Sequence, residues 1–290
     1  MLKYGLQSFL TYLDKERRLS PATVSAYHSD IDQFLDFLGD DAALAPDVLQ
    51  QFSRYLGKRE YSARSISRKL SSIQAFLQHL QASGQLAATL NFHAHSPKQG
   101  KRLPRVLSPE QIEAMIQKVG EDSDFPYRDR AMLDMLYSCG CRVSEVSILR
   151  RQSLARPGLV KIHGKGNKER QVPVGKYLQH ELDGYLRKEY PRLQKEKSGD
   201  ALFLSRHGKS VSRQFVYNLV KKAAKMAGIT GDVGPHTLRH SFATHLLAGD
   251  ANIRDVQLLL GHEDISSTQI YTQVDRSQLK AAYRDAHPLA

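Results

Sequence analysis

The feature that most constrains the fold is a break in the helical pattern at residues 91–104. The stretch combines four residues that interrupt regular backbone with three basic ones: Asn91, Pro97, Gly100 and Pro104 among Lys98, Lys101 and Arg102. A chain of 290 residues makes one large domain or two ordinary ones, and the break favours two. We therefore expect an N-terminal domain at residues 1–90, a basic linker at residues 91–104 and a second domain at residues 105–290.

Residues 2–84 show only the apolar spacing of amphipathic helices, in four stretches. The four apolar faces consist of Leu2, Leu6, Phe9, Leu10 and Leu13; of Val24, Tyr27, Ile31, Phe34 and Leu38; of Val48, Leu49, Phe52 and Leu56; and of Ile66, Leu70, Ile73, Leu77 and Leu80. Ser20 followed by Pro21 is typical of a helix start, and Gly39 and Gly84 are typical of helix ends. The pattern predicts a small bundle of four helices.

The second domain is expected to be mostly helical with one small sheet. Residues 108–111 form a capping-box sequence that predicts a helix start, and a further helical pattern spans about residues 128–138. Two short β patterns, residues 159–162 and 171–174, flank a turn rich in glycine and asparagine, which predicts an antiparallel hairpin. Residues 201–204 are a candidate third strand. The expected fold class is mainly α, with an α+β second domain.

The charge of the chain favours a polyanionic partner. Lys and Arg number 42 against 30 Asp and Glu, which gives a net charge of +12. Nucleic acid is the commonest polyanion that a basic protein binds. Four basic residues lie around the start of the fourth helix, and they fit either a solvated face or a contact with a DNA backbone: Arg59, Arg64, Arg68 and Lys69.

Cysteine content and hydropathy exclude two other classes of protein. The only cysteines, Cys139 and Cys141, are too close together to staple a fold, which excludes a disulfide-dependent secreted module. No apolar run approaches the ~20 residues that a membrane span needs. The expected location is the cytoplasm.

The segment from Gly234 to His245 carries the first chemistry. Pro235 predicts a helix start, which puts His236 and Arg239 on one face of the first turns. An imidazole and a guanidinium at a helix N-terminus suit a phosphate, although an isolated pair of this kind is more often a solvated or packed one. A zinc site at His236 and His240 is disfavoured, because the glutamate of a His-Glu-x-x-His motif is missing.

Four more residues could act on a phosphate, each with a plainer alternative. Arg142 is expected at a helix start, where it could equally pair with Glu145. Lys165 lies in the predicted hairpin turn, where its ammonium could reach a groove or simply be solvated. His262 and Tyr271 follow near the end of the chain. A lone tyrosine, with a pKa near ~10, is a poor nucleophile and is more often a packing residue.

Together these residues form a set that none of them defines alone. In chain order the set is Arg142, Lys165, His236, Arg239, His262 and Tyr271, within the strings 164–170, 236–247 and 260–271. On these strings the chain resembles the tyrosine recombinases, the phage-integrase family, and most closely their bacterial Xer subgroup. The resemblance covers nearly the whole chain.

The resemblance implies an enzyme that cuts and rejoins DNA strands through a 3′-phosphotyrosyl intermediate, with neither a metal nor a nucleotide as cofactor. The implied roles are nucleophile for Tyr271, donors to the phosphate oxygens for Arg142, Arg239 and His262, proton transfer and positioning for His236, and protonation of the leaving 5′-oxygen for Lys165. Glu145 resembles a family position that braces the site. The implied fold is a SAM-like four-helix DNA-binding domain followed by the catalytic domain.

The resemblance also implies partners. These are double-stranded DNA with a specific recombination site, a tetramer with itself or with a paralogous recombinase, and a septal DNA translocase as an activator. The segment after Tyr271 fits a helix exchanged between protomers, with Val274, Leu279, Ala282 and Tyr283. The leading expectation for the role is the resolution of chromosome dimers at cell division.

Three alternatives remain open at the level of the sequence. The same chemistry could serve a mobile element as an integrase or resolvase. The chain could be a DNA-binding module without catalysis, or a metal-dependent nuclease. Cys141 stands where the family usually has an aliphatic residue, which fits a small packing residue better than a redox switch.

Overall fold

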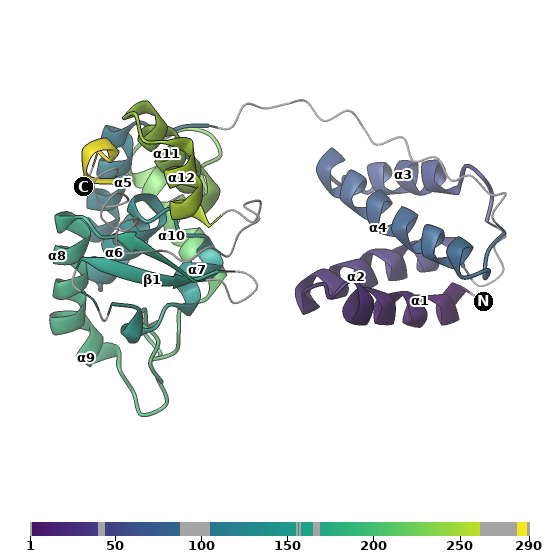
Figure 1. Ribbon diagram of the computed structural model, residues 1–290, viewed down its shortest axis with the longest axis horizontal. Helices are drawn as coiled ribbons and strands as arrows, with labels where there is room; N and C mark the ends of the chain where they lie inside the picture. Colours follow the sequence, from purple (N-terminus) through teal and green to yellow (C-terminus); the bar gives the residue numbers. More distant parts are fainter. Residues whose placement is uncertain are drawn as a thin grey trace. The chain divides into compact units, whose positions relative to one another are not determined.

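The computed structural model forms two compact units, Met1–Arg102 and Leu103–Ala290, which we describe separately (Figure 1). It describes residues 2–39, 44–87, 105–154, 156, 158–164, 169–261 and 283–288. The predicted linker, residues 91–104, lies outside the described residues. In the parts that the structure describes, no helix combines the length and the apolarity that a membrane crossing requires.

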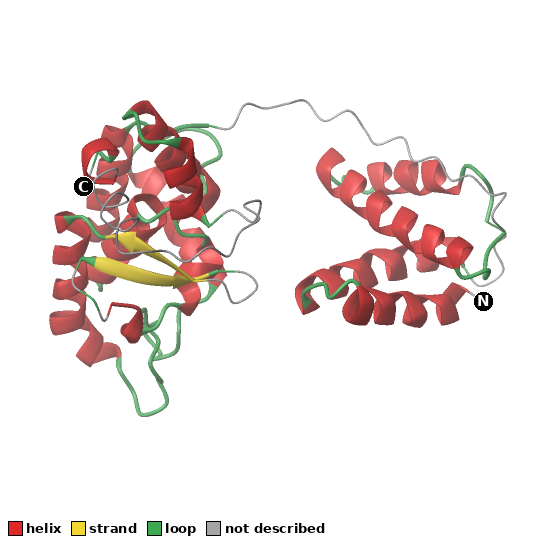
Figure 2. Ribbon diagram, viewed as in Figure 1, coloured by secondary structure: helices red, strands yellow, loops and turns green. Residues whose placement is uncertain are grey.

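The described part of the N-terminal unit is a bundle of helices, as the periodicity predicted (Figure 2). Its elements are α1 (Leu2–Thr11), the π-helical turn η1 (Tyr12–Glu16), α2 (Pro21–Leu38), α3 (Val48–Lys58) and α4 (Ala63–Ala82). The Ser20 hydroxyl accepts the Thr23 N–H at 3.2 Å and caps α2, and Gly39 ends it at a φ of 75°. Four phenylalanine rings fill the centre of the core: Phe9, Phe34, Phe52 and Phe76.

A buried carboxylate joins α2 to α4. Asp30 on α2 is 1% exposed and accepts hydrogen bonds from Lys69 Nζ at 2.9 Å, Ser72 Oγ at 3.0 Å and Arg68 Nη2 at 2.8 Å, all three on α4. A buried carboxylate is costly unless such donors compensate for its lost hydration. The cluster therefore fixes how these two helices pack.

The second unit builds its core around one helix. Its elements are α5 (Pro109–Glu121), α6 (Pro126–Ser138), α7 (Val143–Ile148), η2 (Arg151–Leu154), β1 (Leu159–His163), β2 (Glu169–Pro173), α8 (Lys176–Gly184), η4 (Tyr185–Glu189), α9 (Tyr190–Leu193), α10 (Arg213–Met226), α11 (Pro235–Ala248) and α12 (Ile253–Leu260). The helix α6 packs against α5, α8, α10 and α11, and nearly every side chain from Arg128 to Ser138 is buried. The predicted capping box at Ser108 is present.

The sheet of the second unit is smaller than the sequence predicted. β1 and β2 pair antiparallel, from Leu159 opposite Pro173 to His163 opposite Glu169, which confirms the hairpin. The third strand predicted at residues 201–204 is wrong: the structure has only isolated bridges there. The Tyr185 hydroxyl occupies one edge of this segment, because it donates to the Leu202 carbonyl at 3.0 Å and accepts the Leu204 N–H at 3.0 Å.

The end of the chain packs on α6 and α11. Residues 283–286 form a helical turn, and the Tyr283 ring stacks on His287 at 4.8 Å between centroids. The His287 ring also contacts Tyr137 of α6 and Phe242 of α11. Burial lowers the pKa of His287 to about 3, so this ring is neutral at physiological pH. The other residues of the predicted exchange helix, Val274, Leu279 and Ala282, lie outside the described residues.

A buried acid on α6 makes stability depend on pH. Burial raises the pKa of Asp134 from 3.8 to about 7, and only the Ser138 hydroxyl donates a hydrogen bond to it among the described residues. The folded protein then keeps a proton that the unfolded chain has lost, so stability falls as the pH rises from about 4 to about 7.

We expect Asp134→Asn to remove this loss of stability. The free energy of unfolding of the variant minus that of the wild type should grow by about 1.4 kcal/mol per pH unit between pH ~4.5 and ~6.5. Urea denaturation at several pH values measures the difference. The matched control is Asp183→Asn, which changes a half-exposed aspartate of the same unit. A constant difference for Asp134→Asn across this range would contradict the prediction.

Candidate active site

The site begins where the backbone turns between α6 and α7. Gly140 has a φ of 54°, and an added Cβ there would lie 2.6 Å from the Phe242 ring of α11, so only glycine fits this close turn. Arg142 follows as the N-cap of α7, as predicted. Glu145 Oε2 accepts the backbone N–H of Arg142 at 2.8 Å, and Oε1 accepts Arg142 Nη1 at 2.9 Å. The predicted pair with Glu145 therefore forms, and it orients Arg142.

A second arginine, which sequence reasoning did not single out, binds the same carboxylate. Arg170 on β2 donates from Nη1 to Glu145 Oε1 at 2.9 Å and from Nη2 to Oε2 at 2.7 Å. Burial alone would raise the pKa of Glu145, but the hydrogen bonds and charge of Arg170, and then the hydrogen bonds of Arg142, hold it below its usual value. The sequence carried one signal: Arg170 is in phase with Val172, on the strand face that should be buried.

Arg239 on α11 ties three segments together. Its Nη1 donates to the Gly140 carbonyl and its Nη2 donates to the Leu260 carbonyl at 2.7 Å, at the end of α12. Among the described residues no carboxylate pairs with this guanidinium. Burial, followed by repulsion from Arg142 and Arg170, lowers the pKa of Arg239 to about 10, so the group stays charged at neutral pH.

The resulting site has an excess of positive charge. Three guanidinium groups, those of Arg142, Arg170 and Arg239, face one carboxylate, that of Glu145, which leaves a net charge of two positive. The Arg142 side chain is 35% exposed, so solvent and ligands can reach it. Planar guanidinium groups with free donors suit the oxygens of a phosphate. The described part of the site can therefore hold an anion.

The structure describes three of the six predicted site residues. Arg142 and Arg239 lie in the site, and His236 is exposed in the first turn of α11, one turn before Arg239. Lys165, His262 and Tyr271 lie outside the described residues.

Neighbours of two of these residues are part of the site. Arg170 lies two residues after the segment 165–168, which contains Lys165. Gly261 precedes His262, and a Cβ added to it would lie 3.3 Å from Arg170 Nη1. Gly261, the described residue before His262, therefore lies beside the Arg170 guanidinium.

Other side chains that could bind a metal ion are engaged in contacts that hold the fold together. The His245 ring meets the Tyr137 hydroxyl at 2.8 Å, so it belongs to the contact between α11 and α6. Cys139 and Cys141 are free thiols buried in the core, and the hydrogen bond with Cys141, together with burial, raises the pKa of Cys139. Among the described residues no group of three or more His, Cys, Asp or Glu is arranged to hold a metal ion.

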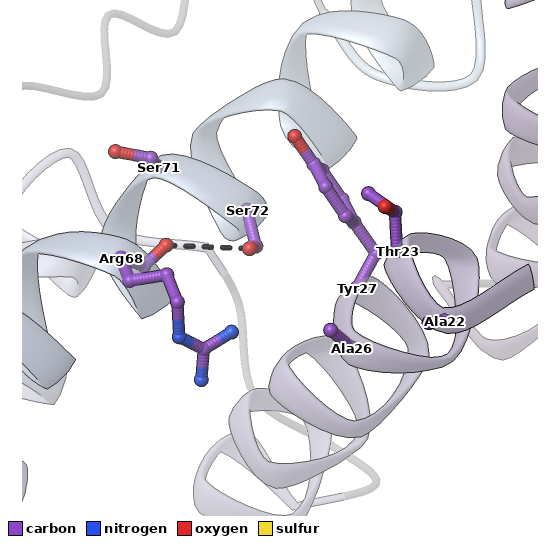
Figure 3. Close-up of a pocket in the computed structure, with 7 residues that line it drawn as sticks. All are labelled: Ala22, Thr23, Ala26, Tyr27, Arg68, Ser71 and Ser72. Carbon is purple, nitrogen blue, oxygen red and sulfur yellow. Dashed lines mark hydrogen bonds between the residues drawn. The ribbon is translucent and has the colours of Figure 1, made fainter. Parts of the chain in front are cut away.

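The N-terminal unit has a hollow of about 500 Å³ between α2 and α4 (Figure 3). It is lined by Ala22, Thr23, Ala26, Tyr27, Arg68, Ser71 and Ser72. Arg68 and Lys69 both bind Asp30, but the Arg68 side chain is 52% exposed whereas that of Lys69 is 9% exposed. The predicted basic cluster is therefore divided by exposure: Lys69 is a buried structural group, whereas the half-exposed Arg68 lies at the hollow with its two Nη atoms bonded to Asp30.

Comparison with known proteins agrees with this architecture. Residues 105–278 match the model of the phage integrase family, and residues 6–84 match that of the phage integrase N-terminal SAM-like domain. Tyrosine recombinase XerD of Listeria innocua is 38% identical over 98% of this chain and 99% of its own.

Two solved structures share the fold. One is the XerH site-specific recombinase bound to a palindromic difH substrate in a post-cleavage complex, with a TM-score of 0.70 and 20% identity over 96% of this chain and 83% of that one. The other is a lambda integrase tetramer bound to a Holliday junction, with a TM-score of 0.70 and 17% identity over 96% of this chain and 76% of that one.

The fold and the matches define a two-domain recombinase with an N-terminal SAM-like domain and an integrase-type catalytic domain. The chain belongs to the phage integrase family and is a tyrosine recombinase. The resemblance inferred from the sequence and the predicted fold class are both confirmed.

Proposed function

We propose that the protein cuts and rejoins duplex DNA at a specific site, with Tyr271 as the nucleophile. The observation that supports this most directly is the half-buried guanidinium of Arg239, which is charged, has no carboxylate partner among the described residues, and is close enough to Arg142 for mutual repulsion. A bound anion would supply the negative charge that Arg239 lacks. The XerH relative is bound to its DNA after cleavage, and we extend that substrate class to this chain.

The proposed reaction exchanges one phosphodiester for another. The Tyr271 oxygen attacks the phosphorus as its phenolic proton passes to His236, the bond from phosphorus to the 5′-oxygen breaks, and Lys165 donates a proton to that oxygen. Arg142, Arg239 and His262 donate to the non-bridging oxygens, where negative charge grows in the transition state. His236 assists proton transfer and positioning. Rejoining is the reverse step, with a 5′-hydroxyl as the attacking group, so bond energy is retained.

In the proposed complex both domains contact the DNA. The exposed part of the Arg68 guanidinium, whose Nη atoms also bind Asp30, would contact a backbone phosphate at the hollow between α2 and α4. Phosphate contacts of this kind make affinity fall steeply with salt. The lambda integrase relative is a tetramer on a Holliday junction, and we propose the same assembly here, with itself or with a paralogous recombinase.

We further propose that the protein acts in the cytoplasm to resolve chromosome dimers at cell division, with a septal DNA translocase as activator. The 38% identity to a XerD recombinase over nearly the whole chain supports this role over that of a mobile-element integrase. The genomic neighbourhood of the recognised site distinguishes the two, because both use the same chemistry.

The test begins by finding the site. Sequencing of chromatin recovered with the protein should yield one recurrent DNA sequence. A nicked duplex with that sequence, which traps the covalent intermediate, should then form an adduct whose modified peptide contains Tyr271. A chelator should leave the rate unchanged, whereas a metal-dependent nuclease would lose its activity. Binding of the duplex without any adduct would contradict the proposal and favour a catalytically inactive DNA-binding module.

A further inference from the structure

Arg170 occupies a position where strand geometry calls for an apolar side chain. It lies opposite Ile162 of β1 and in phase with Val172 of β2, and both of these side chains are fully buried. The Arg170 side chain is itself only 9% exposed. A buried guanidinium is unfavourable unless its charge and its donors are matched. The fold nevertheless keeps this charged side chain in its interior.

Arg170 and Arg142 share the carboxylate of Glu145. Glu145 Oε1 accepts from Arg170 Nη1 and from Arg142 Nη1, both at 2.9 Å. Glu145 Oε2 accepts from Arg170 Nη2 at 2.7 Å and from the Arg142 backbone N–H at 2.8 Å. Every described contact of this carboxylate therefore belongs to one of two arginines, only one of which is accessible to solvent.

The charges explain why two arginines are needed. Glu145 alone would neutralise Arg142 and hold its guanidinium as a closed ion pair. With Arg170 bound through two parallel hydrogen bonds, the negative charge is already compensated. Glu145 can then orient Arg142 through the backbone N–H and one Nη1 bond, while the positive charge of Arg142 stays available to a ligand.

Arg170 also contacts the end of α12. A Cβ on Gly261 would lie 3.3 Å from Arg170 Cδ and Nη1, so the backbone of that residue passes close to the guanidinium. The preceding Leu260 carbonyl is held by Arg239. The strand β2, the start of α7 and the end of α12 therefore meet around one buried side chain.

We infer that Arg170 is a positioning residue of the recombination reaction, which compensates Glu145 so that Arg142 meets the scissile phosphate with its charge available. The inference rests on the proposed function. Arg170 acts through Glu145 and Arg142 and makes no contact with the phosphate itself.

The test compares three variants of the site and one control variant on the nicked duplex that carries the recovered site. Arg170→Met should lower the rate of adduct formation at saturating protein by about 100-fold, the size of losing one preorganised donor, with duplex affinity within about threefold of wild type. Adding Glu145→Gln to Arg170→Met should recover about tenfold in rate, because the uncompensated charge that captures Arg142 is gone. Arg170→Lys keeps the charge without the two-pronged bond and should lose about tenfold.

Arg130→Met is the matched control. It breaks another largely buried arginine–glutamate pair, Arg130 Nε to Glu181 Oε2 at 2.8 Å, which joins α6 to α8. It should lower the melting temperature but leave the adduct rate of the folded protein within about threefold of wild type. If Arg170→Met does not fold, the Lys variant and the doubly neutral variant carry the comparison.

The possible outcomes distinguish a failure of this inference from a failure of the proposed function. If the wild type forms the Tyr271 adduct but folded Arg170→Met reacts at the wild-type rate, Arg170 has no positioning role. A double variant no faster than Arg170→Met would also overturn the inference, because a purely structural role predicts no rescue. If the wild type forms no adduct, the proposed function fails and this inference fails with it.

Discussion

Arg239→Lys is expected to lower the rate of covalent adduct formation by at least about 100-fold, close to the background of Tyr271→Phe. A lysine ammonium cannot replace the planar fork that donates to the Gly140 and Leu260 carbonyls at once. The substitution therefore removes the proposed donor to the phosphate and the hydrogen bonds to two backbone segments, one before Arg142 and one before His262. One preorganised donor alone contributes about 3 kcal/mol to transition-state stabilisation.

The measurement is the first-order rate on the nicked duplex at saturating protein. Arg187→Lys is the matched control, because it changes a largely exposed arginine of the same unit that approaches Asp183 only at 3.6 Å. Binding of the duplex by Arg239→Lys should remain detectable, since under the proposed function many other phosphate contacts contribute to the affinity. A rate within about tenfold of wild type would contradict the role assigned to Arg239.

Asp30→Asn is expected to lower the stability of the N-terminal unit by about 3 kcal/mol. The asparagine keeps the shape of the side chain but leaves the buried Lys69 ammonium without a negative partner. Arg68 contributes less to this loss, because its side chain is half exposed and solvent screens the lost pair. Scanning calorimetry of the full chain should show one of its transitions moved to lower temperature.

Asp32→Asn is the control for this prediction. Asp32 lies two residues further along α2 and pairs with His28 at 3.4 Å, with both side chains about half exposed. Its substitution should change stability by less than about 0.5 kcal/mol. If the two substitutions lower the free energy of unfolding equally, the burial of Asp30 does not make its contacts more stabilising than an exposed ion pair.

Local features of the structure could be predicted from the sequence because their causes lie within a few residues. Ser20 and Ser108 cap their helices through N–H groups three residues ahead, and Gly39 ends α2 through its own positive φ. The same reasoning placed Arg142 at the start of α7 and Arg239 one turn after His236. Residues 201–204 show the limit, because their apolar pattern suits a strand, yet the Tyr185 hydroxyl satisfies the backbone instead.

By itself, the sequence determined the four N-terminal helices, several helix starts of the second unit and the hairpin, since periodicity and capping are read along a single stretch of chain. Its motifs also gave the resemblance to the family. Only the tertiary structure decided which charges meet. Arg170 reaches Glu145 across 25 positions, Lys69 reaches Asp30 across 39, and Arg239 reaches the Gly140 carbonyl across 99. These contacts depend on which buried groups must compensate one another after the helices have packed, and no local pattern encodes that choice.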